Sequence, residues 1–266
     1  MRASAEPWQT SDVASWQEFD EQVRALTRFR WLFRGQGEAH WGLQTSLRRA
    51  FAEATVIKRQ AGNKRGFRVL EHERLLIDRF RRSAHLYRTA LPGQNDPLEW
   101  LGIMQHYGAP TRLLDVTLSP HIAAYFALDQ GAGDSAVFAF DHRQLRPASM
   151  TIRDFERRAL SESERHGGVV YAFSPRLTTE RLLAQQGAFL APSSIEEDFE
   201  DVLRGAGAGG GTCRKLVIPA ALRWEGIDRL KRMNITSTSL FPGIDGFCRS
   251  LRFQIHDPVK NQARLE

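Results

Sequence analysis

The segment from Asp96 to Leu128, DPLEWLGIMQHYGAPTRLLDVTLSPHIAAYFAL, constrains the fold most, because it places polar and charged residues between two strong helix signals. An Asp-Pro pair with a glutamate in the first turn is typical of a helix start, and Gly108 ends this first helix. Ser119, followed directly by proline, begins a second helix that is almost wholly apolar. We therefore expect two core helices that flank a polar connection.

The connection between these helices, GAPTRLLDVTL, is predicted to be a loop, and it carries Thr111, Arg112, Asp115 and Thr117. Arginine and aspartate are rarely buried unless they are paired. Two interpretations follow for Arg112 and Asp115. They form an internal ion pair with each other, or they contact a ligand.

The overall architecture follows from short apolar runs that are interspersed with amphipathic helices. Strands are predicted at 31–36, 135–140, 168–173, 187–190 and 215–219,. A helix capped by Ser11 or Asp12 precedes them, and a helix over 68–87 carries Glu73 on its otherwise apolar stripe. The pattern indicates an α+β fold with a mixed sheet of about five to six short strands flanked by helices.

The domain organisation predicted from length and composition is a single domain over residues 1–266, which is long enough to bury a large core,. Residues 1–29 are expected to contain an N-terminal packing helix. The segment 205–211, GAGAGGG, is expected to be a flexible glycine-rich loop. The basic segment 52–67 is most simply an exposed loop, although it could also rest on phosphates.

The charge balance favours anionic partners, since 37 Lys and Arg residues face 31 Asp and Glu residues and leave a net charge of +6. Nucleic acid and nucleotides are such partners, but a solvated basic surface explains the charge equally well. Cys213 and Cys248 show neither metal-ligand spacing nor a disulfide framework, which fits a reducing compartment. With no signal-peptide pattern and no apolar run long enough to cross a bilayer, we expect a soluble cytoplasmic protein without a membrane partner.

Several catalytic motifs are absent from the sequence. The chain has 8 histidines, but neither HExxH nor paired ligand spacing, and Glu71, His72 and Glu73 point in different directions on a helix,. No GxSxG and no phosphate-binding glycine loop is present. We expect no metal. What remains is a set of polar side chains at the ends of apolar elements.

Several blocks of the chain, taken in order, resemble the FRG-domain family, which is named for a Phe-Arg-Gly signature, here Phe33-Arg34-Gly35. The blocks are WLFRGQGEAHWGLQTSLRR, the helix around Glu73 and Phe80, QHYGAPTRLLDVTLSPHIAAYFAL, RLLAQQGAFL and FPGIDG. The resemblance extends from about residue 30 to residue 250, and the ordered set of blocks is more specific than any single block.

The layout is also similar to that of ADP-ribosyltransferases, and this resemblance implies an ADP-ribosyltransferase-like fold and roles for particular residues. Arg34 would contact NAD and hold its pyrophosphate as a bidentate fork. Thr117 and Ser119 match the element that supports the nicotinamide ribose, and Gln186 matches the residue at the reaction centre. The chain departs from the pattern there, because a transferase usually has glutamate at this position. Either glutamine suffices, or Glu73 or Asp115 supplies the carboxylate.

The resemblance therefore implies two overlapping sets of site residues. The residues implied to be catalytic are Arg34, Thr117, Gln186 and Glu73. The residues implied to bind NAD lie at the ends of the same elements, and they are Arg34, Gln36, His106, Thr111, Arg112, Asp115, Thr117, Ser119, Phe126, Arg181 and Phe189.

The function that this resemblance implies is an NAD-dependent ADP-ribosyltransferase, a glycosyltransferase that uses NAD as substrate and no metal. It would modify a macromolecular acceptor, with DNA or RNA favoured by the basic charge, in a toxin or anti-phage defence setting with an antitoxin or inhibitor as a further partner. The alternative is a non-enzymatic module that binds a nucleotide or nucleic acid, with Arg34 and Arg112 contacting phosphates.

Overall fold

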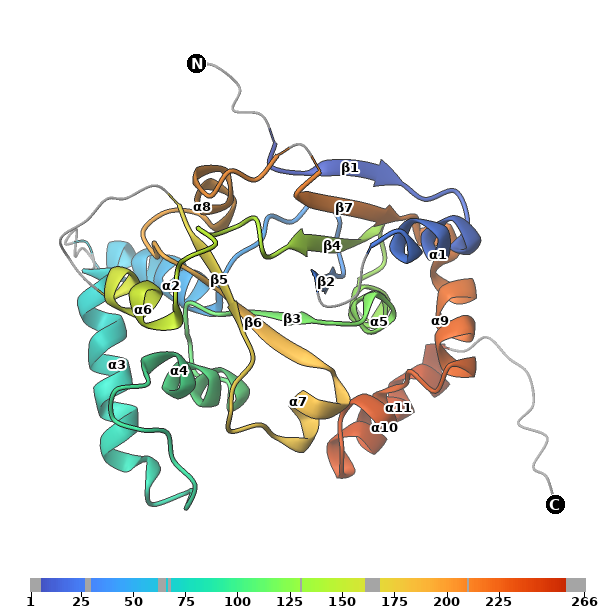
Figure 1. Ribbon diagram of the computed structural model, residues 1–266. Helices are drawn as coiled ribbons and strands as arrows, with labels where there is room; N and C mark the ends of the chain where they lie inside the picture. Colours follow the sequence, from blue (N-terminus) through green and yellow to red (C-terminus); the bar gives the residue numbers. More distant parts are fainter. Residues whose placement is uncertain are drawn as a thin grey trace.

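The computed structural model describes residues 6–26, 30–61, 66, 68–129, 131–160, 168–209 and 211–256. For residues 252–256 it describes the backbone alone. A single sheet crosses the middle of the molecule (Figure 1) and holds seven strands in the described part of the chain, in the order β1-β7-β4-β2-β3-β6-β5. In chain order the strands are β1 (Gln9–Asp12), β2 (Trp31–Gln36), β3 (Leu114–Thr117), β4 (Ser135–Asp141), β5 (Val170–Phe173), β6 (Gly187–Pro192) and β7 (Cys213–Ile218).

Helices surround this sheet, and Figure 1 shows α2, α3, α4 and α6 on its left and α1, α9 and α11 on its right. In chain order they are α1 (Trp16–Arg24), α2 (Ser46–Gln60), α3 (Val69–Ala84), α4 (Pro97–His106), α5 (Pro120–Asp129), α6 (Ile152–Ala159), α7 (Glu180–Ala184), α8 (Phe199–Gly205), the 3-10 turn η1 (Ala220–Leu222), α9 (Arg223–Arg232), α10 (Ser237–Leu240) and α11 (Ile244–His256).

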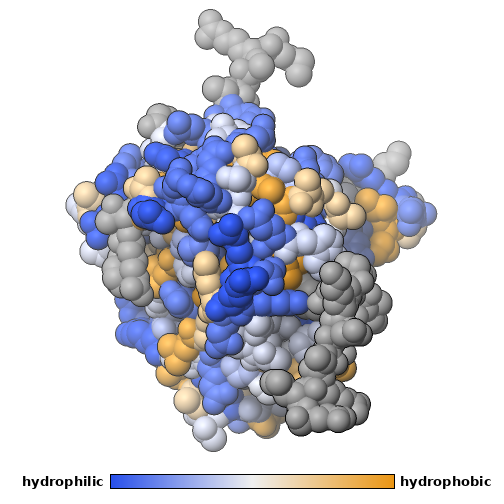
Figure 2. All heavy atoms as spheres, turned by 90° about the vertical axis from the view of Figure 1, so that its right-hand side faces the viewer, coloured by the Kyte–Doolittle hydropathy of each residue, from blue (hydrophilic) through white to orange (hydrophobic). Residues whose placement is uncertain are grey.

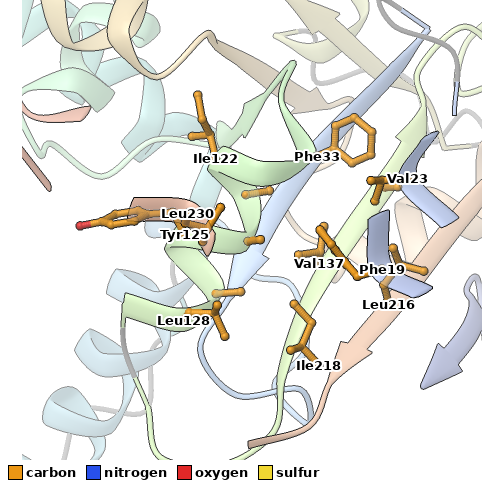
Figure 3. Close-up of a cluster of buried hydrophobic side chains, with 14 of the residues drawn as sticks. Phe19, Val23, Phe33, Ile122, Tyr125, Leu128, Val137, Leu216, Ile218 and Leu230 are labelled. Carbon is orange, nitrogen blue, oxygen red and sulfur yellow. The ribbon is translucent and has the colours of Figure 1, made fainter. Parts of the chain in front are cut away.

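One core cluster packs α1, α5 and α9 against the sheet (Figure 3). Phe33, Val137 and Leu216 come from three neighbouring strands and meet Phe19 of α1 and Leu230 of α9, and all are buried. Two further clusters lie elsewhere on the sheet, one below α8 and one between β6 and helices α3, α4 and α6. Burial of apolar area on both faces of the strands is the main source of the stability of such a layered fold.

Gly35 sets the distance between α5 and the sheet. A Cβ atom at this position would lie 1.8 Å from the carbonyl oxygen of Ala123 and 2.5 Å from the backbone nitrogen of Ala127. Both alanines are fully buried. Only a residue without a side chain permits this approach of helix and strand, so the glycine of the Phe-Arg-Gly motif has a packing role.

The sheet opens between β2 and β3. β2 pairs with β4 along its whole length, and β3 pairs with β6 along its whole length. β2 and β3, in contrast, are antiparallel neighbours that pair only at Phe33 and Thr117. Beyond this pair the two strands continue as Arg34–Gln36 and Leu114–Val116 without further ladder pairing, which leaves backbone and side chains of both strands facing a gap.

The α+β prediction with a mixed sheet and flanking helices is confirmed, and the strand count is seven instead of five or six. β3 was expected to be a loop, because four residues between two helix signals are too short to show strand periodicity. β1 has the polar sequence QTSD, which carries no apolar alternation. Ser11 therefore lies in a strand, and the residue that caps α1 is Ser15, whose hydroxyl accepts from the Glu18 N–H,.

The basic segment 52–67 is helical up to Gln60 rather than a loop, since α2 continues through alanine, glutamate and arginine positions that favour helix,. Residues 62–65 and 67 lie outside the described residues, as do residues 1–5 and 27–29 of the N-terminal segment. In the segment 205–211, Gly207 and Gly209 have φ of 83° and 158°, which glycine accommodates, and residue 210 lies outside the description,.

The surface formed by the right-hand side of Figure 1 is mostly hydrophilic, with scattered hydrophobic residues (Figure 2). Scattered apolar residues are normal for a protein surface in water. Among the described residues, no helix combines the length and the apolar character needed to cross a bilayer.

The close approach at Gly35 predicts that Gly35→Ala destabilises the protein by about 1–3 kcal/mol or more, because backbone atoms of α5 must move. Urea unfolding measures this change. Gly42→Ala is the matched control, since a Cβ there meets only the Glu200 carboxylate at 3.5 Å, an ordinary contact. Equal unfolding midpoints for the two variants would contradict the packing role of Gly35.

Candidate functional site

A cleft of about 960 Å³ lies where the sheet opens between β2 and β3. It is lined by both strands, the end of α4, α7 and the segment that follows β2. Its chemically distinctive side chains are aromatic rings, cationic groups, amides and one carboxylate: Phe33, Trp41, Phe126 and Phe189; Arg34, Arg49, Arg181, His40 and His106; Gln36, Gln44, Gln105 and Gln185; and Asp115.

Arg34 spans the opening of the sheet. It follows Phe33 on β2, and its Nη1 donates a hydrogen bond of 2.8 Å to the carbonyl oxygen of Asp115 on β3. Its Nε is buried and has no hydrogen-bond partner in the described part of the chain. A buried guanidinium donor without an acceptor is disfavoured, and an anion in the cleft would supply one.

The cations of the cleft interact with one another. Burial lowers the pKa of Arg34, Asp115 raises it and Arg49 lowers it further. Burial and then the repulsion from Arg249 lower the pKa of Arg181, whose guanidinium lies 4.9 Å from the centre of the Phe241 ring. With three guanidinium groups against one carboxylate, the cleft favours an anionic ligand.

His106, at the end of α4, is held in its neutral form. Burial lowers the pKa of His106 first, and the positive charges of Arg181 and Arg88 lower it further, against the opposing effect of Asp115. A histidine with a lowered pKa stays uncharged near neutral pH. His106 therefore adds a polar ring nitrogen to the cleft, within 3.4 Å of the Thr179 hydroxyl, rather than a further positive charge.

Thr117 ties β3 to the turn before β6. Its hydroxyl donates to the carbonyl oxygen of Gln185 at 2.7 Å and accepts from the Ser119 N–H at 3.1 Å. The Ser119 hydroxyl accepts from the Ile122 N–H at 3.3 Å and so caps α5,. Thr117 lines the cleft, whereas Ser119 is not among the described lining residues.

The glutamine that reaches the cleft is Gln185 and not its neighbour Gln186. Gln185 is the C-cap residue that directly follows α7, and its Nε2 donates to the Leu240 carbonyl oxygen at 3.1 Å. Gln186 has a left-handed φ of 46° and an exposed side chain outside the cleft lining. The left-handed residue reverses the chain between helix and strand, and this turn decides which of two adjacent amides faces the cleft.

Arg112 and Glu73 lie outside the cleft, in a buried ion pair with side chains that are each 1% exposed. The Arg112 guanidinium donates to both carboxylate oxygens of Glu73, with Nε 2.8 Å from Oε1, and its Nη1 donates to the carbonyl oxygens of Ala159 and Pro192. The expected partner of Arg112, Asp115, is instead exposed in the cleft. Glu73 is therefore not placed to act on a ligand there.

Thr111 is also buried, but it reaches the cleft indirectly. Its hydroxyl donates to Oε1 of Gln105 at 2.5 Å, and the Nε2 of Gln105 donates to Oδ2 of Asp115 at 2.8 Å. Ser46, the first residue of α2, also donates to Gln105 Oε1 at 3.2 Å. Gln105 therefore links the buried Thr111 hydroxyl and the half-buried Ser46 hydroxyl to the carboxylate of the cleft.

Several further residues of the implied NAD-binding set line the cleft, and they are Gln36, Phe126 and Phe189. Sequence reasoning did not single out Trp41, Arg49 and Gln105, whereas Gln185 was expected beside Gln186 at the mouth of a strand. Trp41 is 55% exposed, and its carbonyl oxygen accepts from Gln36 Nε2 at 2.7 Å. An aromatic residue in a glycine-flanked segment directly after the Phe-Arg-Gly motif was a usable signal for Trp41.

In the described residues, no three His, Cys, Asp or Glu side chains gather as a metal site.

Comparison with known protein families identifies residues 29–135 as an FRG domain. Residues 29–135 therefore form an FRG domain, as the blocks within this range predicted, and the blocks RLLAQQGAFL and FPGIDG lie outside the matched region. The matched region begins just before β2 and ends at the start of β4, so that it includes Arg34, Gln105, Asp115 and Thr117. No curated protein and no solved structure matches the chain.

The buried ion pair predicts that Glu73→Ala destabilises the protein by about 3–5 kcal/mol, because it leaves the Arg112 charge buried without its partner. The double variant Glu73→Leu with Arg112→Met should cost less than the sum of the two single changes, since no charge remains buried. Urea unfolding measures both.

The control for this prediction is Asp228→Ala, which removes an exposed carboxylate paired with Arg232 on α9. Such a pair contributes about 0.3–0.5 kcal/mol. If Glu73→Ala lowered the unfolding free energy no more than this control, the stabilising role of the pair would be wrong.

Proposed function

We propose that the cleft binds NAD and that the protein is an NAD-dependent ADP-ribosyltransferase acting on a macromolecular acceptor. The observation that supports this most is the convergence of three elements on one cleft. Arg34 lies on β2, Thr117 on β3 and Gln185 just before β6, and these strands are neighbours in the sheet, whereas Gln186, the residue that the resemblance matches, lies next to Gln185 outside the lining. They are the three elements that the resemblance to ADP-ribosyltransferases matches.

The cleft has the size and chemistry that NAD requires. Pockets for ligands of this kind measure about 300–1,000 Å³ and combine apolar walls with a few polar groups. Trp41, which is exposed, and Phe126, which is half-buried, offer ring faces for the planar groups of NAD, while the buried Phe33 and Phe189 form part of the apolar wall,. Arg34, Arg49 and Arg181 offer guanidinium groups for the pyrophosphate,. Arg34 holds its position across the sheet opening through Asp115, so its charge is fixed before a ligand binds.

The chemistry needs neither a metal nor a redox reaction. Breaking the bond between nicotinamide and ribose develops positive charge on the ribose, and positioned polar or anionic groups stabilise it. Thr117 can still accept a hydrogen bond from a ribose hydroxyl, since its own proton is donated to Gln185. Asp115 is the one carboxylate among the described lining residues.

A nucleic acid acceptor fits the net charge of +6, because phosphate contacts and counterion release favour basic proteins,. Modification of nucleic acid would harm a cell, so a toxin or anti-phage defence role with an antitoxin or inhibitor partner belongs to this proposal. The second candidate function is a non-enzymatic module that holds a nucleotide or nucleic acid in the same cleft. It is favoured by the amide at the position where transferases usually have glutamate.

Release of nicotinamide from NAD tests the proposal, measured with and without sheared DNA, total RNA and a protein mixture. We expect release that depends on one acceptor class and falls by about 100-fold or more in Arg34→Ala, because the ligand loses a charged bidentate contact as well as its positioning.

Arg232→Ala is the matched control, since it removes the same charge from an exposed pair on α9. It should release nicotinamide at the rate of the wild type. No nicotinamide release by the wild type with any acceptor, together with salt-sensitive binding of nucleic acid, would replace the transferase with the binding module.

A further inference from the structure

We infer that Asp115 is the base that accepts the proton of the acceptor during transfer, and that Gln105 is the residue that positions its carboxylate. This inference rests on the proposed function and assigns a group that the resemblance leaves open, because the third element carries glutamine. An amide side chain does not take up a proton near neutral pH, so a carboxylate has to come from another element.

The balance of the reaction requires such a group. The bond between ribose C1′ and the nicotinamide nitrogen breaks, and nicotinamide leaves as a neutral molecule with the electron pair. An N–H or O–H nucleophile of the acceptor forms the new bond to C1′ and loses its proton. A carboxylate beside the reacting carbon can take this proton and can also stabilise the positive charge that develops on the ribose.

Asp115 is placed for this role by β3. Its side chain is exposed in the cleft, and it shares the opening of the sheet with Arg34, which bonds its carbonyl oxygen. Thr117, two residues further, lies on the same face of the strand. Glu73, the other carboxylate considered, is buried against Arg112 and cannot reach a ligand in the cleft.

Gln105 fixes one oxygen of the Asp115 carboxylate and leaves the other available. Its Nε2 donates to Oδ2, and Oδ1 has no hydrogen bond to any described residue. The orientation of the amide follows from Thr111, whose hydroxyl donates to Oε1 and so turns Nε2 toward Asp115,. The single proton of the Ser46 hydroxyl is shared between Oε1 and the Thr111 carbonyl oxygen, each at 3.2 Å.

The hydroxyls that orient Gln105 are themselves held. Ser46 accepts from the Thr111 N–H at 2.9 Å, and the Thr111 hydroxyl accepts from the Leu113 N–H at 3.1 Å. Thr111 is fully buried. The carboxylate is thus tied to the start of α2, the end of α4 and the chain before β3, and such a chain of hydrogen bonds restricts its motion.

The test measures turnover and NAD binding separately for Asp115→Asn. We expect kcat for nicotinamide release, with the acceptor mixture present, to fall by about 100- to 10,000-fold. The dissociation constant for NAD should stay within about threefold of the wild type, since Arg34 and the ring contacts remain. Gln105→Met should lower kcat by about 10- to 100-fold, again with little change in NAD binding, because the carboxylate is less well aimed.

Chemical rescue separates a proton acceptor from a structural role. Added formate should restore part of the activity of Asp115→Ala, because a small carboxylate can occupy the space of the missing side chain. Asp228→Asn, on the exposed face of α9, should behave as the wild type in every measurement.

Three other outcomes would each overturn the inference that Asp115 is the base. Wild-type kcat in Asp115→Asn shows that another group takes the proton while leaving the transferase proposal intact. A loss of NAD binding that accounts for the whole loss of activity shows that Asp115 only binds. A wild type that neither binds nor consumes NAD overturns the proposed function and this inference together.

Discussion

The contact of α5 with β2 at Gly35 is the constraint on which the cleft depends. The absence of a side chain at Gly35 lets the helix backbone lie directly on the strand, with Ala123 and Ala127 as its contact residues. α5 begins three residues after Thr117, so the same contact fixes the end of β3 beside β2. The preceding residue, Arg34, is then presented at the point where the two strands separate. The Arg34-Gly35 dipeptide thus supplies both the close contact with α5 and a guanidinium group of the cleft.

The separation of β2 from β3 opens a cleft in the middle of the sheet. Continuous pairing would satisfy the backbone groups of both strands with one another. Here pairing stops after Phe33 and Thr117, and the Arg34 guanidinium crosses to the Asp115 carbonyl oxygen in place of a ladder hydrogen bond. The gap receives side chains from both strands, which explains how aromatic, cationic and amide groups converge in one cleft.

The polar residues between α4 and α5 divide into two groups with different physical roles. Arg112 is fully buried, and its charge is neutralised by Glu73 from α3 and solvated by two backbone carbonyl groups. Asp115, three residues later on β3, is exposed in the cleft. Thr111 belongs to neither group alone, since it is buried and yet acts on Asp115 through Gln105. The segment therefore contributes both the internal support of the cleft and its carboxylate.

Local signals in the sequence predicted those elements that local physics determines. The proline-started helices α4 and α5 and the apolar strands β2, β4 and β6 lie where their caps and apolar runs indicated. β3 was missed because a strand of four residues owes its conformation to its neighbour β6. The pairing of Arg112 with Glu73 joins residues 39 positions apart, and no local pattern specifies it. The choice between Gln185 and Gln186 depends on one left-handed residue in a turn.

Calorimetric titration of NAD into the wild type, Arg34→Ala and Arg232→Ala tests most directly whether the opening between β2 and β3 is a nucleotide site organised by Arg34. We expect saturable binding to the wild type and to Arg232→Ala. Binding to Arg34→Ala should weaken by about 10- to 100-fold, which corresponds to the loss of a charged hydrogen-bonded contact of about 1.5–3 kcal/mol. Equal affinities of Arg34→Ala and the wild type, or no binding of NAD to the wild type, would contradict this account.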